Sequence, residues 1–596
     1  MRGLTHMLPM GKFSRCLAAA GLVLCFASAA QAAPNSGSPV GSTNVTVADP
    51  TVPRPPGTPC VVQLFSNDTF DDFSEHTFNY APPAGCGTRW SKVVLEGDFS
   101  VTAGIQFDRT ATIFLGGVNL YFGTTQEPDP TEAQSWHIER DLTDYSALFS
   151  KAGEGQALIG NIVNSTDTGV INGSARLLFY PASVVAPAAQ VPNAVYAFGT
   201  DPIGSTTALN TSTDQLTATL TLPRNVERAY VDVFTQSQIG DEFWYTCVPN
   251  QFVAETQECG GGNFREAEIS IDGQPAGVAP VYPWIYTGGI DLFMWEPTPG
   301  VQALNFIPYR VDLTPFAALL SNGQPHTVAL SVQGANDFFS ATAALLVFQD
   351  PHAKQVTGQL VRNTLVNQPP NPTIGSTLNQ DSSGNVTGAI TTDLSRHFII
   401  EGYVNTSSGR VDTTVNQTVS FANTQTFNIN ATFFGQISQQ LTKVDGVSSS
   451  TVDGFPSGEF DSHYSYPLNV NVGETVDSSG NISIVTTVKQ DYNQKTSLGI
   501  GGLQLYSAEV HNHVNAGDTL QLNASDEITG HSGQFNTQDF TFQDSLGGCY
   551  RRSVGVTNDT VSSFSNGQGC PGQQNRVFWF TEPDGSPYQG EGFLGW

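Results

Sequence analysis

The chain has 596 residues, with 53 acidic residues against 24 lysines and arginines, so its formal net charge is −29. A chain of this length can form several domains, each with its own hydrophobic core. Because so acidic a surface repels phosphate groups, we expect neither nucleic acid nor an anionic membrane as a partner.

The first 32 residues have the pattern of a cleaved secretory signal peptide. Basic residues come first, an apolar run covers 17–30, and Ala30-Gln31-Ala32 supplies small residues for cleavage. The run is too short to anchor the chain in a bilayer, and no later apolar stretch is long enough to span one. Cleavage would leave 21 basic against 53 acidic residues, a charge of −32. We therefore expect a secreted or periplasmic protein, and a monomer.

Beyond a Pro/Gly/Ser/Thr-rich segment at 33–59, the chain has the pattern of β-structure. Apolar and polar residues alternate, Val, Thr, Phe and Tyr are frequent, and Gly, Asn or Pro separate the runs. Two segments, 142–149 and 313–320, instead each have the apolar spacing of a short helix. The clearest predicted strands are 93–99, 110–115, 118–121, 175–180, 217–222, 230–234, 267–271, 327–332 and 343–348.

Two stretches repeat the same motifs in the same order. Phe107-Asp108-Arg109 and Asp141-Leu142-Thr143 of the first correspond to Phe264-Arg265-Glu266 and Asp312-Leu313-Thr314 of the second. Ordered blocks of this kind indicate two units of one topology. We predict an all-β fold, with two tandem jelly-roll-like β-sandwiches packed side by side and a C-terminal accessory β-domain.

The composition also predicts where these units begin and end. Segments rich in Pro, Ala, Ser and Thr join the two copies and lead away from the second copy. The predicted divisions are signal peptide 1–32, linker 33–59, first sandwich 60–183, linker 184–215, second sandwich 216–352, linker 353–393 and C-terminal β-domain 394–596.

Six cysteines remain after removal of the signal peptide, an even number in an oxidising compartment. Pairing of sequence neighbours predicts the disulfides Cys60–Cys86, Cys247–Cys259 and Cys549–Cys570. Zinc is the rival interpretation, but the sequence has no CxxC pair. His511 and His513 would share one face of a strand, and no third ligand accompanies them. We expect no metal and no cofactor.

The acidic residues that could do chemistry are few. Asp108 stands between Phe107 and Arg109 at the start of a predicted strand, where an ordinary surface ion pair is the alternative. Asp241-Glu242-Phe243-Trp244-Tyr245 places acids beside aromatic rings, a mixture that suits a sugar, although the rings could equally fill a core. Glu266 and Trp295-Glu296 are further candidates for the same cleft.

Several motifs together resemble the glycoamidase A family, the peptide-N4-(N-acetyl-β-glucosaminyl)asparagine amidases of plants, fungi and acid-active bacterial enzymes. The resemblance covers roughly 60–350, and it lies in the ordered set rather than in any one motif. The motifs are Tyr80-Ala81-Pro82-Pro83, Gln106-Phe107-Asp108-Arg109, Leu115-Gly116-Gly117-Val118, Asp241-Glu242-Phe243-Trp244-Tyr245, Val248-Pro249-Asn250, Phe264-Arg265-Glu266 and Tyr286-Thr287-Gly288-Gly289-Ile290.

The chain is also distantly similar to the flavobacterial glycoamidase F type, whose active site lies in the groove between two jelly rolls. The essential aspartate of that type lies in a Trp-Asp-Arg motif, which Phe107-Asp108-Arg109 resembles, so Asp108 is the implied principal catalytic carboxylate. The two supporting glutamates of the F type do not carry over, since they fall near Asn161 and Gly261. We therefore predict Glu242 as the second carboxylate, with Glu266 in reserve.

The resemblance implies hydrolysis of the amide that joins asparagine to the first N-acetylglucosamine of N-linked glycopeptides and glycoproteins. Because plant-type enzymes of the family accept core α1,3-fucose, we extend the expectation to glycans that carry it. Arg109 and Asn161 would orient the amide or stabilise the oxyanion, Trp244 and Trp295 would hold the chitobiose core, and Glu296 would contact the substrate. Two alternatives stay open: an endo-β-N-acetylglucosaminidase, which also uses paired carboxylates, and a noncatalytic glycan-binding protein.

Overall fold

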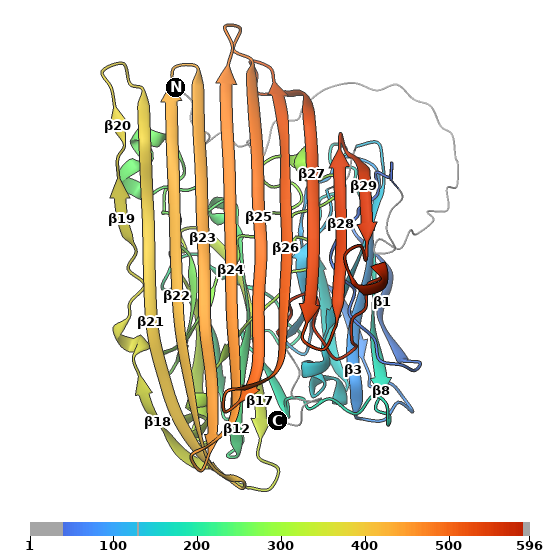
Figure 1. The fold of residues 1–596 in the computed structure, drawn as a ribbon. Coiled ribbons are helices and arrows are strands. Elements are labelled where there is room, and N and C mark those ends of the chain that lie inside the picture. The colour runs from blue at the N-terminus through green and yellow to red at the C-terminus, as the bar shows by residue number, and fades with distance from the viewer. Residues whose placement is uncertain (1–39, 128–129, 588–596) are drawn as a thin grey trace.

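The computed structural model describes residues 40–127 and 130–587, so the predicted signal peptide lies outside the described residues. Strands dominate it, as Figure 1 shows, and they form five sheets in which neighbouring strands run antiparallel. The predicted all-β fold is confirmed. No helix in the described part of the chain is both long and apolar enough to cross a membrane.

The first sandwich is a jelly roll. Its two four-stranded sheets have the strand orders β1-β8-β3-β6 and β2-β7-β4-β5, so strands adjacent in sequence mostly lie in opposite sheets. The strands are β1 Cys60–Phe70, β2 His76–Tyr80, β3 Trp90–Val101, β4 Thr110–Leu115, β5 Val118–Thr124, β6 Gln134–Asp141, β7 Gly153–Ile159 and β8 Ile171–Pro181.

The second sandwich repeats this topology strand for strand. Its sheets have the orders β10-β17-β12-β15 and β11-β16-β13-β14, each strand nine numbers after its counterpart, and β9 pairs with β17 at the edge. The repeated sequence motifs therefore do mark two units of one topology. The strands are β9 Ala194–Ala197, β10 Thr207–Leu209, β11 Leu216–Leu220, β12 Val226–Gln238, β13 Glu266–Ile271, β14 Gln274–Pro280, β15 Tyr309–Asp312, β16 His326–Gln333 and β17 Phe338–Gln349.

Helical turns occupy the two predicted helical segments. They are 3-10 turns η3 (Thr143–Tyr145) and η4 (Leu148–Ser150) after β6, and η8 (Thr314–Phe316) with helix α2 (Ala317–Leu320) after β15. The first of these turns joins the sandwiches, because Arg310 of β15 pairs with Asp144 at 2.6 Å. The remaining helical elements are η5 Ile239–Asp241, η6 Asn250–Phe252, α1 Val253–Thr256, η7 Leu292–Trp295, η9 Leu365–Asn367 and η10 Pro571–Gln573.

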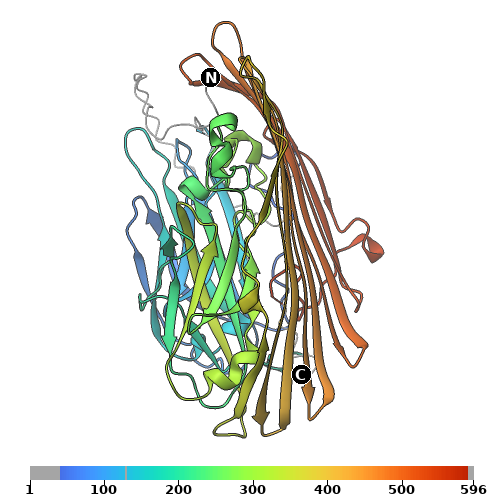
Figure 2. The same ribbon diagram turned by 90° about the vertical axis from the view of Figure 1, so that its left-hand side faces the viewer.

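The C-terminal region is one twelve-stranded sheet that lies along the sandwiches as a further layer, which Figure 2 shows from the side. Several of its strands are about twenty residues long, far longer than those of the sandwiches. They are β18 Thr357–Asn363, β19 Thr373–Ser376, β20 Asn379–Gln380, β21 Val386–Thr406, β22 Gly409–Asn430, β23 Phe433–Val452, β24 Phe455–Val476, β25 Ile482–Ile500, β26 Leu503–Leu522, β27 Ile528–Asp544, β28 Cys549–Thr557 and β29 Thr560–Asn566.

Strands fall inside segments predicted as linkers. The segment 184–215 contains β9 and β10 of the second sandwich, and 353–393 contains β18 to β20 and the start of β21. Their Pro- and Gly-rich composition suggested free linkers, but short edge strands tolerate such residues because one side of the backbone has no partner. These two segments are therefore parts of sheets.

The large sheet shares a hydrophobic core with the second sandwich. One cluster of buried side chains contains residues of both, including Phe264 and Phe421, whose rings meet edge to face at 5.3 Å. A second cluster, around Phe99, Tyr121 and Trp136, forms the core of the first sandwich and also includes Ala344 and Leu346 of β17. The accessory domain is thus packed as a layer of the main body.

The three predicted disulfides are present. They join Cys60 to Cys86, Cys247 to Cys259, and Cys549 to Cys570. The pairing of sequence neighbours is confirmed, and the bonds join cysteines 26, 12 and 21 positions apart in sequence.

Candidate active site

Asp108 lies at one end of the β4–β5 hairpin, where the first sandwich faces the second. The hairpin turns at Gly116 and Gly117, which both have positive φ. Its ladder continues one step beyond the strands, since the Thr125 N–H donates to the carbonyl of Arg109 at 2.8 Å. The half-buried Asp108 side chain then accepts a hydrogen bond from the Gly288 N–H of the second sandwich at 3.2 Å. Asp108 therefore lies at the junction between the two sandwiches.

Glu127 lies directly beside Asp108, although the sequence analysis did not single it out. The backbone N–H of Asp108 donates to the Glu127 carboxylate, which is only 9% exposed. Gly288 fits between the two acids: a Cβ added there would overlap the Glu127 carboxylate and approach Asp108 Oδ1 to 3.2 Å. Only a glycine allows this backbone to come so close.

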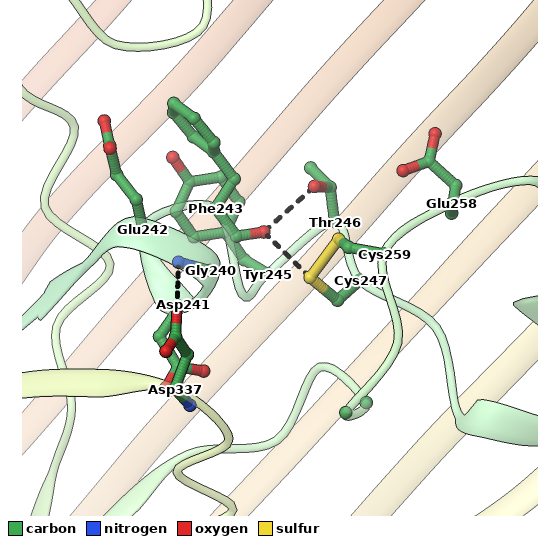
Figure 3. Close-up of a disulfide and its surroundings, with 12 residues drawn as sticks. Gly240, Asp241, Glu242, Phe243, Tyr245, Thr246, Cys247, Glu258, Cys259 and Asp337 are labelled. Carbon is green, nitrogen blue, oxygen red and sulfur yellow. Dashed lines mark hydrogen bonds between the residues drawn. A yellow bond between two sulfur atoms is a disulfide. The ribbon is translucent and has the colours of Figure 1, made fainter. Parts of the chain in front are cut away.

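Glu242 approaches Asp108 from the second sandwich, on the turn that follows β12. Its side chain points away from that of its neighbour Asp241 (Figure 3). Asp241 is fully buried, pairs with Arg265 at 2.5 Å and accepts the N–H groups of 336–338, so it holds the loop together. Of this acidic pair, Glu242 is the one available for chemistry.

The three acids, which we call the carboxyl cluster (Asp108, Glu127 and Glu242), favour bound protons. Burial, and then the charge of Asp108, raises the pKa of Glu242 from 4.5 to about 8. Burial raises the pKa of Glu127 well above its ordinary value, and the charges of Asp108 and Glu296 raise it further. Burial also raises the pKa of Asp108, but the Gly288 N–H and Arg109 oppose this. Asp108 therefore has the best support for a negative charge, a difference that can divide acid from base.

Arg109 provides a cation beside the cluster. Burial lowers the pKa of its guanidinium, while the charges of Asp108, Asp167 and Glu127 oppose the change. The guanidinium lies 5.5 Å from the ring centre of the exposed Phe107. Its Nε has no hydrogen-bond partner among the described residues. The guanidinium therefore places a positive charge beside the carboxyl cluster.

Glu266 does not belong to this cluster, which corrects its choice as the reserve carboxylate. It is 1% exposed and hydrogen-bonds to Arg396 of the large sheet, so it lies between the second sandwich and that sheet. Burial raises its pKa to about 7, and Arg396 opposes the rise. A buried partner of an arginine cannot reach a substrate at Asp108, so we assign Glu266 a structural role.

The two tryptophans expected to hold sugars are core residues. Trp244 and Trp295 are both 0% exposed, and the indole N–H of Trp295 donates to the Gly289 carbonyl at 2.7 Å. Because a sugar stacks only on an accessible ring face, neither can be a platform. The expectation for both residues is wrong. Glu296, next in sequence, is 6% exposed and acts on the cluster through its charge on Glu127.

Asn161 is also inaccessible to a substrate. It is 0% exposed, donates to the Phe70 carbonyl at 2.8 Å and accepts from the Gln106 side chain. Gln106 in turn accepts the Phe107 N–H at 2.7 Å. Asn161 therefore braces the backbone just before Asp108, which corrects the prediction that it contacts the amide.

No metal centre is evident in residues 40–127 and 130–587, where no group of three or more His, Cys, Asp or Glu side chains is arranged to hold an ion. His511 and His513 instead donate hydrogen bonds from Nδ1 to the side-chain oxygens of Asn493 and Asp491 on the neighbouring strand, both at 2.8 Å. They pair across the large sheet.

The position of Glu127 beside Asp108 could have been predicted from the hairpin. Strands 110–115 and 118–121 joined by Gly116-Gly117 form a hairpin, and its register pairs Thr110 with Thr124. Asp108 lies two residues before Thr110 and Glu127 three residues after Thr124, so the same hairpin brings the two acids together. Gly288 had no comparable signal, because its approach depends on packing between the sandwiches.

Two jelly rolls that bring acids from both sides to one junction define a two-domain β-sandwich protein with a carboxyl site. A family model described as peptide N-acetyl-beta-D-glucosaminyl asparaginase amidase A matches residues 50–365, and a model of the PNGase A C-terminal domain matches 389–468. The chain belongs to this amidase A family.

Three known proteins are similar to the chain. The chain is 26% identical over 511 residues to peptide-N4-(N-acetyl-beta-glucosaminyl)asparagine amidase A of Prunus dulcis, across 83% of this chain and 86% of that protein. Among solved structures, PNGase F of Flavobacterium meningosepticum is 14% identical, covering 49% of this chain and 96% of its own, with a TM-score of 0.34. PNGF-II is 14% identical, covering 50% and 66%, with a TM-score of 0.34.

Proposed function

We propose that the protein is an N-glycan amidase, which hydrolyses the amide between asparagine and the proximal N-acetylglucosamine of glycopeptides and glycoproteins. The observation that carries the proposal is the carboxyl cluster between the two jelly rolls, in a member of the amidase A family. The products would be a peptide with aspartate in place of asparagine and a glycosylamine, which decays to the free sugar and ammonia.

The protonation pattern of the cluster suggests the roles of the acids. An unactivated amide needs a base for the attacking water and a proton for the departing nitrogen. The Gly288 N–H and Arg109 stabilise the ionised form of Asp108. Asp108 takes a proton from the attacking water while the oxygen of this water bonds to the amide carbon. As the C–N bond breaks, Glu242 in its protonated form supplies the proton that the nitrogen needs. Glu127 carries a second bound proton beside Asp108.

Arg109 would stabilise the oxyanion that forms on the amide carbonyl. Its guanidinium adjoins Asp108, and its positive charge acts on both Asp108 and Glu127. A donor aimed at developing negative charge in a site shielded from water contributes about 2.7–4 kcal/mol in other amide hydrolases. No metal or cofactor enters these steps.

An exposed apolar rim next to Asp108 would receive the peptide part of the substrate. The loops that carry it are contiguous: the Asn161 N–H donates to the Asp72 carbonyl at 3.0 Å, and the Thr168 N–H donates to the Ile105 carbonyl at 2.9 Å. The three aliphatic members of this rim suit the apolar side chains that flank a glycosylated asparagine better than they suit hydroxyl groups. The members of the rim, each 37–62% exposed, are Phe73, Ile105, Phe107, Ile162 and Val163.

One mass-spectrometric assay tests the function. A defined glycopeptide is incubated with the protein, and the mass at the asparagine is measured. Conversion to aspartate supports the amidase, one remaining sugar identifies the endoglycosidase, and an unchanged peptide leaves a glycan-binding protein. Asp108→Asn should lower the rate at least about a thousandfold, whereas Asp71→Asn, at an exposed acid nearby, should not. Full activity of Asp108→Asn would disprove the site.

The proposal also covers export, oligomeric state and the acceptance of core fucose. The signal-like leader supports export, and the mature chain would act as a monomer in the periplasm or the medium. The enzyme would accept glycans with a core α1,3-fucose, as expected for the plant-type family. Paired glycopeptides with and without this fucose test the last point, since a rate ratio far from one would contradict it.

A further inference from the structure

The face of the large sheet that covers the second sandwich carries a row of buried amide and hydroxyl side chains. Such groups are costly to bury unless they make hydrogen bonds. Their partners are therefore informative, because an apolar residue would have been the cheaper choice at each position. The row, which we call the polar row, consists of Asn423, Gln425, Gln436, Ser438, Gln490, Gln534 and Asn536, each at most 3% exposed.

Four members of the polar row hold the chain just after Glu242. Their donors reach three successive backbone carbonyls, those of residues 245–247. Gln436 donates to Thr246 at 2.8 Å and Gln425 donates to Cys247 at 3.0 Å. The Tyr245 carbonyl accepts both from Ser438 at 2.9 Å and from Asn423 at 3.2 Å.

The other three hold the segment that contains Gly288 and Glu296. Gln534 donates to the Glu296 carbonyl at 2.9 Å. Asn536 donates to the carbonyls of Thr298 at 2.7 Å and Met294 at 3.2 Å. Gln490 bridges the base of the segment, donating to the Pro283 carbonyl at 2.7 Å and accepting the Val301 N–H at 2.9 Å.

These two segments are the ones by which the second sandwich reaches Asp108. Both are irregular, so their buried carbonyls find few partners within their own backbone, and each unpaired one would cost free energy. The large sheet supplies the missing donors, from strands more than a hundred residues away in sequence.

We propose that the C-terminal sheet is a working part of the active site, whose polar row positions Glu242, Gly288 and Glu296 against Asp108. The members of the row are positioning residues and touch no substrate. Since a displacement of about 1 Å in an active site can cost about a hundredfold in rate, loss of one donor should affect turnover more than folding.

The chain offers a matched control. Gln538 lies on β27 two residues after Asn536, on the same face, and is also fully buried. Its side chain instead holds the N-terminal segment, accepting the Ala48 N–H at 2.7 Å and donating to Asp49 at 2.8 Å. Gln538→Met therefore removes a buried amide of the same sheet without touching either active-site segment.

The experiment compares Gln436→Met and Asn536→Leu with Gln538→Met in the full-length protein. Hydrogen exchange of 242–247 and 288–298, followed without substrate, needs no assumption about function. The kinetic readout rests on the proposed amidase. We expect Gln436→Met and Asn536→Leu to accelerate exchange in their own segment, lower kcat about tenfold or more with a smaller change in KM, and shift the pH profile. Gln436→Glu, whose neutral carboxyl can donate the same bond, should restore kcat at acid pH.

The outcomes are separable. If the wild type leaves glycopeptides intact, the proposed function fails, while the exchange data still judge the positioning role. If Gln436→Met and Asn536→Leu match Gln538→Met in exchange, kcat and pH profile, the inference is overturned. Should either variant fail to fold, Ser438→Ala removes one donor to Tyr245 with a minimal change of volume and is judged by the same measurements.

Discussion

Replacement of Glu242 by glutamine links the geometry of the site to a stability that can be measured. The pKa of Glu242 is raised from 4.5 to about 8 by burial and by Asp108. At about 1.4 kcal/mol per pH unit this rise corresponds to roughly 5 kcal/mol. Because the side chain is partly exposed, we discount it for solvent screening to about 2–3 kcal/mol.

The sign follows from the raised pKa. The folded protein holds the Glu242 proton more tightly than the unfolded chain does, so the free energy of unfolding falls as the pH rises from 4.5 to about 8. Glutamine does not titrate and escapes this loss. Glu242→Gln should therefore match the wild type in stability at pH 5 and exceed it by about 2–3 kcal/mol at pH 9.

Urea unfolding of both proteins at the two pH values measures the effect, and Glu266→Gln is a control for turnover. Burial also raises the pKa of Glu266, to about 7, and Arg396 keeps Glu268 as a partner at 3.5 Å, so Glu266→Gln should likewise gain stability relative to the wild type between pH 5 and pH 9. It should keep its turnover per folded molecule, because Glu266 lies away from Asp108.

Two results would refute the reasoning about Glu242. A stability difference that does not change between pH 5 and pH 9 would show that its carboxyl is not buried beside the charge of Asp108. Turnover should fall about a hundredfold or more if Glu242 supplies the proton to the leaving nitrogen. Undiminished turnover would transfer that role to Glu127.

Three further changes probe the surroundings of Asp108. Glu127→Gln should lower kcat about tenfold to a hundredfold and change the acid limb of the pH profile; an unaltered profile would contradict its coupling to Asp108. Gly288→Ala should cost about a hundredfold in kcat, since its Cβ would overlap Glu127, whereas Gly153→Ala, with its nearest contact at 3.7 Å, should stay close to the wild type. Ile162→Ser should raise KM about tenfold for glycopeptides with apolar neighbours of the asparagine and little for polar ones, and an equal effect on both would argue against the peptide rim.

Much of the fold was predictable because its signals are local. Alternation of apolar and polar residues with Gly and Pro turns predicted strand 110–115, which the structure has as β4 Thr110–Leu115. Repeated motifs predicted two units, and the strand orders of the two jelly rolls correspond one to one. The short edge strands of 184–215 and 353–393 escaped prediction, because their pairing is set by the neighbouring sheet.

The site was only partly predictable, and the failures have physical reasons. Trp244 and Trp295 have the composition of a sugar platform, but the large sheet covers the loops that carry them, so their rings fill a core. Asp241 and Glu242 are adjacent in sequence, yet one binds Arg265 inside the loop and the other faces Asp108. Composition cannot distinguish neighbours whose side chains leave a turn in different directions.

The sequence by itself determined the all-β class, the duplicated unit, the neighbour disulfides and the position of Asp108 at the start of a strand, because period, turns and spacing are properties of short segments. Only the tertiary structure decided that Glu127, Glu242 and Gly288 meet at Asp108, and that Glu266 is bound to Arg396 instead. It also decided which backbone carbonyls the polar row binds, since hydrogen bonds between segments hundreds of residues apart arise only when the sheet packs on the sandwich.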